Sequence, residues 1–218
     1  ALWSEMYNPD KITLLPGWTE RHISNDLERH KGYFPYKDMD ETKLRKAMAA
    51  YYANVSHIDY YVGRMVDILK NKGIYDNTLI IYTSDHGDYM GYHNLILKGG
   101  YMYDPLMKVP LIIKYPNQEK KGSVSEALIN NIDIAPTILT QAGCRVGKYM
   151  TGLDMKNGED GRDYIFAETG VGIEYMVRSR TSKLLWCKSE QLSQFFDLEE
   201  DPFELNNLID EPDYQWEV

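Results

Sequence analysis

A long stretch of the chain carries hydrophobic residues at the spacing of an α-helix. Between about Thr42 and Gly73, apolar side chains recur every three or four residues, which places them on one face of a helix. Lys70 suits the negative end of the helix dipole, and Gly73 can end the helix. The pattern therefore predicts one long amphipathic helix. Its apolar stripe consists of Tyr51, Val55, Ile58, Val62, Met65 and Leu69.

Two continuous apolar runs follow this helix. Thr78 to Thr83 (TLIIYT) and Val109 to Lys114 (VPLIIK) lack polar alternation, which is typical of strands buried on both faces of a parallel sheet. Pro110 places the second run at a sheet edge or at the first residues of its strand. The segment NIDIAPTILTQAG predicts another helix, with Asp133 as its N-cap and Gly143 at its end. This order of elements indicates an α/β fold.

After about residue 150 the hydrophobic runs become short and closely spaced. They predict an antiparallel meander with strands at 164–168, 174–180, 183–188 and 194–198. Asp201, Pro202 and Glu204 then predict a short helix, because they supply a cap, a first-turn proline and a capping-box acid. Glycines cluster between about 145 and 160, and we divide the chain there into domains of residues 1–150 and 151–218.

The composition restricts the classes of protein to which the chain can belong. The 218 residues are 43% hydrophobic and 26% charged, as in an ordinary globular protein. A net charge of −9 disfavours nucleic acid as a partner, and no apolar run is long enough to predict a membrane span. Cys144 and Cys187 lack the spacing of a metal site or a disulfide framework. The N-terminus lacks the basic and apolar regions of a signal peptide, so we expect it to come from inside a longer protein.

A cluster of chemically active residues follows the first apolar run. Ligands bind beyond the carboxyl ends of strands in open parallel sheets, and Asp85 and His86 lie at that point, where both can reach one cation. Lys98 follows on the same loop, which also contains His93, and can bring a positive charge near Asp85 and His86. A cation and an ammonium together would bind a tetrahedral oxyanion such as sulfate or phosphate. The alternative is an ordinary turn with a solvated lysine and a packed histidine.

The residues around this cluster resemble a known family. The stretch NTLIIYTSDHGDYMGYHNLILKGG is similar to the second metal motif of the sulfatases, within the alkaline phosphatase superfamily. Further segments match in order over residues 42 to 212, namely KVPLIIKYP, NNIDIAPTILTQAG, MVRSRTSKLLWC and FFDLEEDPFELNNLID. The resemblance implies the C-terminal part of an alkaline-phosphatase-like sheet with flanking helices, plus a small antiparallel α+β subdomain.

The resemblance also implies roles for individual residues. Asp85 and His86 would be metal ligands, and Lys98 would bind the sulfate group and the ester oxygen. His93 matches a G-x-H position and would act in catalysis or substrate binding, whereas Asp88 would hold the loop. Two positions depart from the family pattern and would alter the substrate pocket: Tyr92, where an acid is frequent, and Asn94, where glycine is frequent.

Other parts of a sulfatase are absent from the sequence. The family's nucleophile is a formylglycine made from the Cys or Ser of a C/S-x-P-x-R motif, and neither Cys144 nor Cys187 begins such a motif. A pair of aspartate ligands is also missing, and neither His22 nor His30 has the flanks of the family's upstream sulfate-binding histidine. We therefore expect the C-terminal half of a sulfatase, inactive alone, which associates with itself or with its missing N-terminal half.

Several alternatives stay open at this point. The resemblance implies calcium, whereas the imidazole of His86 suits manganese or zinc better. The leading function is hydrolysis of a sulfate ester, such as a carbohydrate or aryl sulfate. The alternatives are a phosphodiester or phosphonate hydrolase of the same superfamily, or a non-catalytic fragment. The family is commonly extracytoplasmic, but the sequence itself leaves the compartment undetermined.

Overall fold

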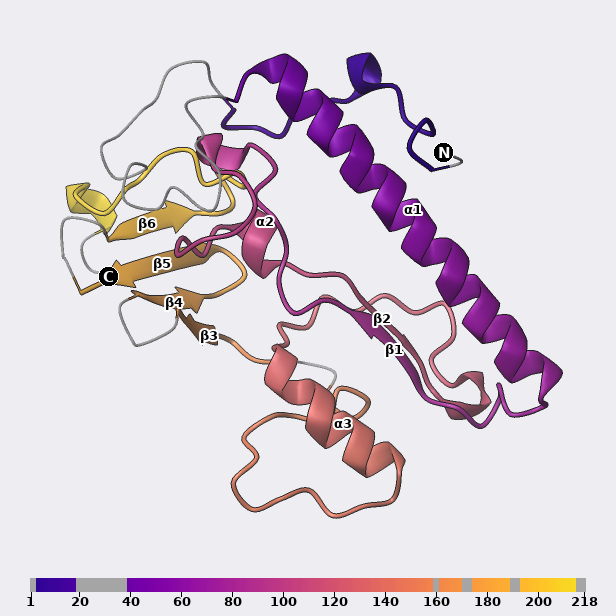
Figure 1. Cartoon of the computed structure of the whole chain (residues 1–218). Coiled ribbons are helices and arrows are strands. Elements are labelled where there is room, and N and C mark those ends of the chain that lie inside the picture. The colour runs from indigo at the N-terminus through magenta and orange to yellow at the C-terminus, as the bar shows by residue number, and fades with distance from the viewer. Residues whose placement is uncertain (1–2, 19–38, 159–160, 170–173, 189–192, 215–218) are drawn as a thin grey trace. The chain divides into compact units, whose positions relative to one another are not determined.

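The computed structural model describes residues 3–18, 39–158, 161–169, 174–188 and 193–214 (Figure 1). His22 and His30 lie outside the described residues. The chain forms two compact units, one of Ala1–Gly99 and Asp104–Glu119, the other of Gly100–Tyr103 and Lys120–Val218. Short 3₁₀ turns lie at Pro9–Lys11, Tyr92–Asn94, Pro116–Gln118, Asn131–Asp133 and Pro212–Tyr214.

The predicted long helix is present in the first unit as α1 (Glu41–Asn71). The Asp40 side chain caps its start by accepting a hydrogen bond from the Lys43 backbone N–H at 2.8 Å. The helix ends at Lys72, and Gly73 adopts a left-handed φ of 68°. Periodicity and end signals thus placed this element correctly. In the described part of the chain, no helix has the length and apolar character that a membrane span requires.

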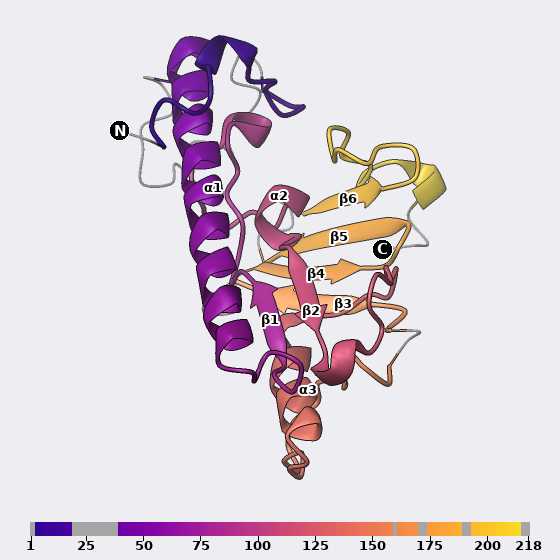
Figure 2. The same cartoon turned by 90° about the vertical axis from the view of Figure 1, so that its right-hand side faces the viewer.

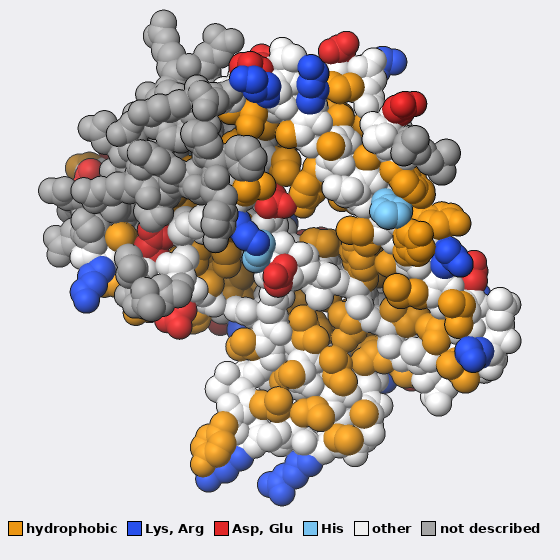
Figure 3. Space-filling view, in the orientation of Figure 1, with side chains coloured by type: hydrophobic (Ala, Val, Ile, Leu, Met, Phe, Trp, Pro, Cys, Tyr) orange, Lys and Arg blue, Asp and Glu red, His pale blue; other side chains and the backbone are white. Residues whose placement is uncertain are grey.

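Only the N-terminal part of α1 is buried. Leu44 and Met48 form a core cluster with Ile12, against which Trp18 and Met90 pack. The predicted apolar stripe lies mostly farther along the helix, where its side chains reach solvent in this chain (Figure 3). Exposed fractions on this stripe are 46% for Val55, 50% for Ile58 and 62% for Met65.

The two apolar runs form strands, but their predicted parallel arrangement is wrong. Strands β1 (Ile80–Thr83) and β2 (Leu111–Lys114) pair antiparallel, with Ile80 opposite Lys114 and Thr83 opposite Leu111. None of the residues in these two strands is buried, and Ile112 is 65% exposed. An unbroken apolar run indicates that both faces are apolar, but it carries no information on the direction of the partner strand.

The connection between these strands carries the candidate site and one short helix, α2 (Asp104–Met107). At its end, β2 begins directly after Pro110, which agrees with the predicted place of that proline. The Lys114 ammonium donates a hydrogen bond to the Thr78 backbone oxygen at 3.0 Å and also contacts the Tyr75 carbonyl. Lys114 therefore ties β2 to the segment that leads into β1.

In the second unit, helix α3 (Ile134–Gln141) occupies the predicted position. Asp133 is at the N-cap position, as predicted, but its fully buried carboxylate makes no capping hydrogen bond to the helix. The Arg162 guanidinium donates two hydrogen bonds to it, at 2.5 and 2.6 Å, and the Leu153 backbone N–H donates a third at 2.7 Å. A Cβ on Gly152 would lie 2.1 Å from the Ile132 backbone oxygen, so this loop needs glycine to approach the helix.

The predicted antiparallel meander is confirmed. Strands β3 (Ile165–Glu168), β4 (Glu174–Arg178), β5 (Ser182–Cys187) and β6 (Gln194–Asp197) form one sheet in chain order (Figures 1 and 2). Alternate residues of β4 and β5 are buried, including Met176 and Leu185. The Tyr103 ring contacts Phe196, and its hydroxyl donates to Gln194 Oε1 at 2.9 Å.

The predicted helix after Asp201 is wrong, because the chain forms turns there. Glu204 points into the core and forms an ion pair with Lys183 at 2.6 Å, with both side chains fully buried. Its backbone φ of 51° is left-handed and cannot continue a helix. Asn207 instead accepts a hydrogen bond from the Phe195 backbone N–H at 3.0 Å and covers β6. The motif therefore closes a sheet edge.

Apart from Gly100–Tyr103, which belong to the second unit, the two compact units divide the chain between residues 119 and 120. Helix α3 belongs to the second unit for this reason. The assignment of residues 1–150 to a catalytic domain and 151–218 to a subdomain stays a prediction. The mixed α/β class itself agrees with the sequence.

Candidate functional site

The candidate site begins where β1 ends. Ser84 Oγ donates a hydrogen bond to the His86 backbone oxygen at 2.7 Å, and the His86 backbone N–H donates to Asp85 Oδ1 at 2.9 Å. The Gly87 backbone N–H donates to the Leu106 oxygen at 2.7 Å. A Cβ on Gly87 would lie 2.0 Å from the Pro105 backbone oxygen, so only glycine fits this close approach. The turn is thus fixed at each residue from 84 to 87.

The hydrogen bonds of the His86 ring show which of its two nitrogens can bind a cation. Nδ1 lies 2.9 Å from the Gly87 backbone oxygen, and a carbonyl oxygen can only accept. Nδ1 therefore carries the proton, and the lone pair of Nε2 is available to a cation or a donor. Such a bond from the second ring nitrogen to a carbonyl is the usual support of a metal-binding histidine.

The structure brings three of the predicted site residues together. His86 Nε2 lies 3.7 Å from Asp85 Oδ2 and 3.4 Å from Lys98 Nζ. Asp85 is largely exposed, and His86 is about one-third exposed. The hydrogen bond from the His86 backbone N–H, with the nearby imidazole, lowers the pKa of Asp85. A carboxylate oxygen, an imidazole nitrogen and an ammonium thus meet at one exposed point.

A tightly closed loop places Lys98 close to Asp85 and His86. The Tyr89 backbone N–H donates to the Leu97 oxygen, and the Gly91 N–H donates to the Leu95 oxygen, both at 2.8 Å. Lys98 follows the residue that closes the loop. Left-handed φ values, which are unfavourable for residues other than glycine, occur at Met90, His93, Asn94 and Leu97. Backbone strain of this kind is concentrated at functional sites in proteins.

Both departures from the family pattern lie inside this loop. Asn94 has a φ of 61°, a conformation that asparagine tolerates better than most residues, so it can replace glycine there. The Asn94 and Tyr92 side chains are both buried, and their expected effect on the substrate pocket stays a prediction. The His93 ring contacts the Tyr92 ring at 4.7 Å between centroids. The catalytic role of His93 stays a prediction.

The remaining acid of the motif lies beside α1. Burial raises the pKa of Tyr51, and the neighbouring Asp88 carboxylate raises it further. This position agrees with the expectation that Asp88 holds the loop.

Asp85 and His86 fit two positions of a divalent cation, since Asp85 Oδ2 and His86 Nε2 lie 3.7 Å apart. Across the residues that the structure describes, no group of three or more His, Cys, Asp or Glu side chains comes close enough to hold a metal. The pair therefore fits a part of a metal site, and further ligands would have to join it.

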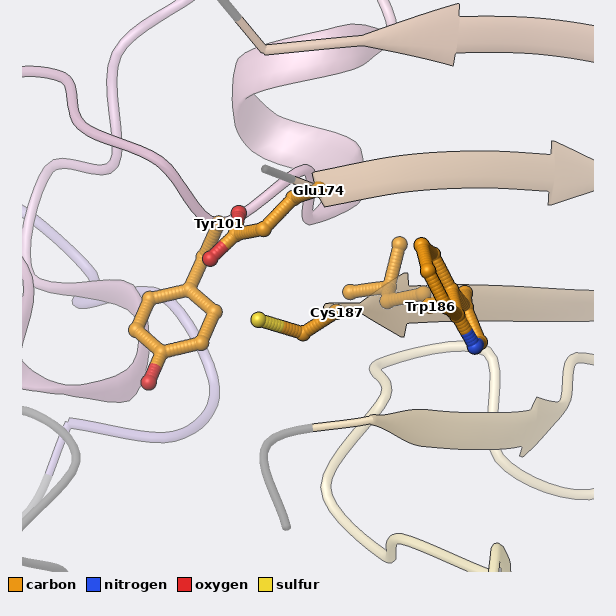
Figure 4. Close-up of a pocket in the computed structure, with 5 residues that line it drawn as sticks. Tyr101, Glu174, Trp186 and Cys187 are labelled. Atoms are coloured by element: carbon orange, nitrogen blue, oxygen red, sulfur yellow. The ribbon is translucent and has the colours of Figure 1, made fainter. Parts of the chain in front are cut away.

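A separate small cavity of about 10 Å³ lies in the second unit, with room for one water molecule. Tyr101, Glu174, Trp186 and Cys187 line it, and the Glu174 carboxyl group and the Cys187 thiol lie on its Tyr101 side (Figure 4). Burial raises the pKa of Glu174 to about 7. This cavity could not be predicted from the sequence, because its residues come from distant segments.

Comparison with known proteins identifies the family. The sulfatase family model matches residues 21–144, and the model for the C-terminal part of N-sulphoglucosamine sulphohydrolase matches residues 91–217. The chain belongs to the sulfatase family. An arylsulfatase of Clostridium perfringens is 35% identical over 97% of this chain and 46% of its own length.

Solved structures agree with this assignment. A protein in complex with its substrate D-glucosamine-2-N,6-O-disulfate has a TM-score of 0.73 and 33% identity, over 81% of this chain and 39% of its own. The phosphonate monoester hydrolase of Agrobacterium radiobacter has a TM-score of 0.72 and 27% identity, over 82% of this chain and 40% of its own. The chain thus has the fold of this superfamily and spans less than half the length of these relatives.

Proposed function

We propose that this sulfatase chain supplies part of the metal and sulfate site of a sulfuric ester hydrolase. Asp85 and His86 hold a divalent cation, and Lys98 binds the sulfate group and the ester oxygen. One observation carries the proposal: His86 Nε2 lies 3.7 Å from Asp85 Oδ2 and 3.4 Å from Lys98 Nζ. With a cation on Asp85 and His86, the cation and the Lys98 ammonium would both attract a tetrahedral oxyanion.

Hydrolysis of a sulfate ester breaks an S–O bond, and negative charge develops on the ester oxygen as it leaves. The Lys98 ammonium is suited to stabilise this charge, because preformed charges act most strongly where charge develops in the transition state. A divalent cation, when bound, supplies Lewis-acid charge to the sulfate oxygens. Calcium is the family's usual ion, and manganese suits the His86 nitrogen better. His93 is proposed as a further contact to the substrate.

The nucleophile must come from outside this chain. Formylglycine forms in a C/S-x-P-x-R motif, which the sequence does not contain. We therefore propose that the 218 residues alone are inactive and act together with a further part of the enzyme. The exposed apolar stripe of α1, with Met65 62% exposed, supports a surface that such a part covers. Association of the chain with itself is the alternative.

The substrate class follows from the relatives. Their names include an arylsulfatase and a protein with a glucosamine disulfate substrate, so we propose an aryl or carbohydrate sulfate. The second candidate is phosphonate monoester hydrolysis, which the likeness to the Agrobacterium radiobacter enzyme favours. Both reactions act on a tetrahedral anion and differ in the central atom.

A chimeric enzyme tests the proposal. The part of the Clostridium perfringens arylsulfatase that lies outside the match is joined to this chain, and turnover is measured with 4-nitrophenyl sulfate and with 4-nitrophenyl phenylphosphonate. We expect a higher kcat/KM for the sulfate, and a large loss of activity with Asp85→Asn. Lys108→Met is the matched control, since Lys108 is an exposed lysine outside the site. Preference for the phosphonate would favour the second candidate, and full activity of Asp85→Asn would contradict the site.

A further inference from the structure

Ser84 is the residue that follows the last residue of β1 and precedes the two candidate metal ligands, Asp85 and His86. Its hydroxyl donates to the His86 backbone oxygen at 2.7 Å and approaches Asp85 Oδ1 at 3.3 Å. The strand ends one residue earlier, at Thr83, so the Ser84 side chain is not needed for strand pairing. Within the described part of the chain, the hydrogen bonds that its hydroxyl makes go to residues 85 and 86.

We propose that Ser84 is a positioning residue that orients Asp85 and His86 for binding a divalent cation. This inference rests on the proposed function, because it assumes that these two residues bind the cation. It assigns to the serine a role that the chemistry of the ligands alone does not reveal.

The first part of the argument concerns Asp85. Its Oδ1 accepts the His86 backbone N–H at 2.9 Å and lies near the Ser84 hydroxyl at 3.3 Å. The single proton of the Ser84 hydroxyl goes to the nearer His86 oxygen, so the His86 N–H is the main donor to Oδ1, and Oδ2 lies 3.7 Å from His86 Nε2. The bond from the His86 N–H favours one of the staggered conformations of the Asp85 side chain, and the Ser84 bond to the His86 oxygen holds the turn in which that bond forms.

The second part concerns His86. A hydrogen bond from the Ser84 hydroxyl to the His86 backbone oxygen fixes the peptide plane that follows the histidine. The same peptide leads to Gly87, whose oxygen accepts from the ring Nδ1 at 2.9 Å. The orientation of the ring, and with it the direction of Nε2, therefore depends on the bond that Ser84 makes.

Neighbouring Thr83 provides a matched comparison. Its hydroxyl makes a long contact of 3.4 Å with the Ser84 backbone oxygen, and this contact involves neither ligand residue. Thr83→Val removes this hydroxyl and keeps a β-branched side chain suited to a strand. It therefore changes the same turn by one hydroxyl group without changing the orientation of Asp85 or His86.

The experiment measures binding of Mn²⁺ and Ca²⁺ to the chimeric enzyme, which contains the further ligands, by isothermal titration calorimetry, with thermal unfolding measured on the same samples. We expect Ser84→Ala to weaken cation binding about 10-fold, within the range found for supporting residues of metal ligands. Ser84→Thr restores the hydroxyl and should recover affinity, and Thr83→Val should bind as the wild type does. The Tm of Ser84→Ala should fall by only about 2–4 °C.

The outcomes separate this inference from the proposed function. If Asp85→Asn weakens binding but Ser84→Ala leaves it within about twofold, the cation site stands and the role of Ser84 is refuted. If Thr83→Val weakens binding as much as Ser84→Ala, the effect belongs to the turn in general and the inference fails. A chimeric enzyme that binds neither cation contradicts the metal site itself, and the inference with it.

Discussion

Glu174 offers a direct test of the electrostatics of the second unit. It is the first residue of β4 and only 6% exposed, in the cavity beside Tyr101 and Cys187. Burial raises its pKa from the ordinary 4.5 to about 7. Ionising it in the folded chain therefore costs roughly 3 kcal/mol more than in the unfolded chain.

The direction of the pH dependence follows from this difference. The folded chain retains the proton of Glu174 at a pH where the unfolded chain has lost it, so stability falls as pH rises from about 4.5 to about 7. Glu174→Gln mimics the protonated form at every pH. We expect it to change stability by about 1 kcal/mol or less at pH 5 and to stabilise the chain by about 3 kcal/mol at pH 8.

The assay is urea unfolding at both pH values, followed by tryptophan fluorescence and extrapolated to water. Glu168→Gln is the matched control, because Glu168 lies in the same sheet but is exposed. Its effect should be small and the same at both pH values. An equal effect of Glu174→Gln at pH 5 and pH 8 would refute the assignment of a buried carboxyl group that resists ionisation.

Three further predictions concern other parts of the chain. Arg162→Met should destabilise it by about 3–5 kcal/mol in urea unfolding, because it leaves the buried Asp133 carboxylate without its charged partner. The Arg162 guanidinium and two backbone N–H donors hold the pKa of Asp133 below its ordinary value, against the opposing effect of burial, so this stabilisation should be lost as pH falls below about 4. Gly87→Ala should lower the Tm of the chain and also weaken Mn²⁺ binding by the chimeric enzyme in titration calorimetry, since its Cβ would lie 2.0 Å from the Pro105 oxygen and shift the turn. Glu204→Ala should destabilise the chain by about 3–5 kcal/mol, whereas replacement of both Glu204 and Lys183 by Leu and Met should cost less.

Local signals in the sequence predicted most elements of the fold. Helix α1 and the four strands of the second sheet follow from hydrophobic spacing and end signals, because these depend on neighbouring residues. The antiparallel direction of β1 and β2 does not follow from hydrophobic spacing, because it is set by the path of the chain between residues 84 and 110. Glu204 shows a second kind of failure. Its place after Asp201 and Pro202 matches a helix start, but a buried ion pair with Lys183 holds it in a turn.

The candidate site was predictable to a similar extent. The spacing of Asp85, His86 and Lys98 indicated that they would meet, and they do. The hydrogen bonds of Ser84 could not be predicted from its place in the chain, because they depend on the torsion angles of the turn. The burial of Tyr92 and Asn94 was also beyond the sequence, since it results from a loop that closes on itself through left-handed residues.

The central claim is that Lys98 stabilises charge on the leaving oxygen of a sulfate ester. The most direct test is kcat/KM of the chimeric enzyme and its Lys98→Met variant for a series of aryl sulfates whose phenols differ in pKa. We predict a loss of about 10²–10³-fold that grows as the leaving phenol becomes more basic, because the ester oxygen then carries more unstabilised charge. The same loss for every phenol, or no loss relative to Lys108→Met, would contradict this role of Lys98.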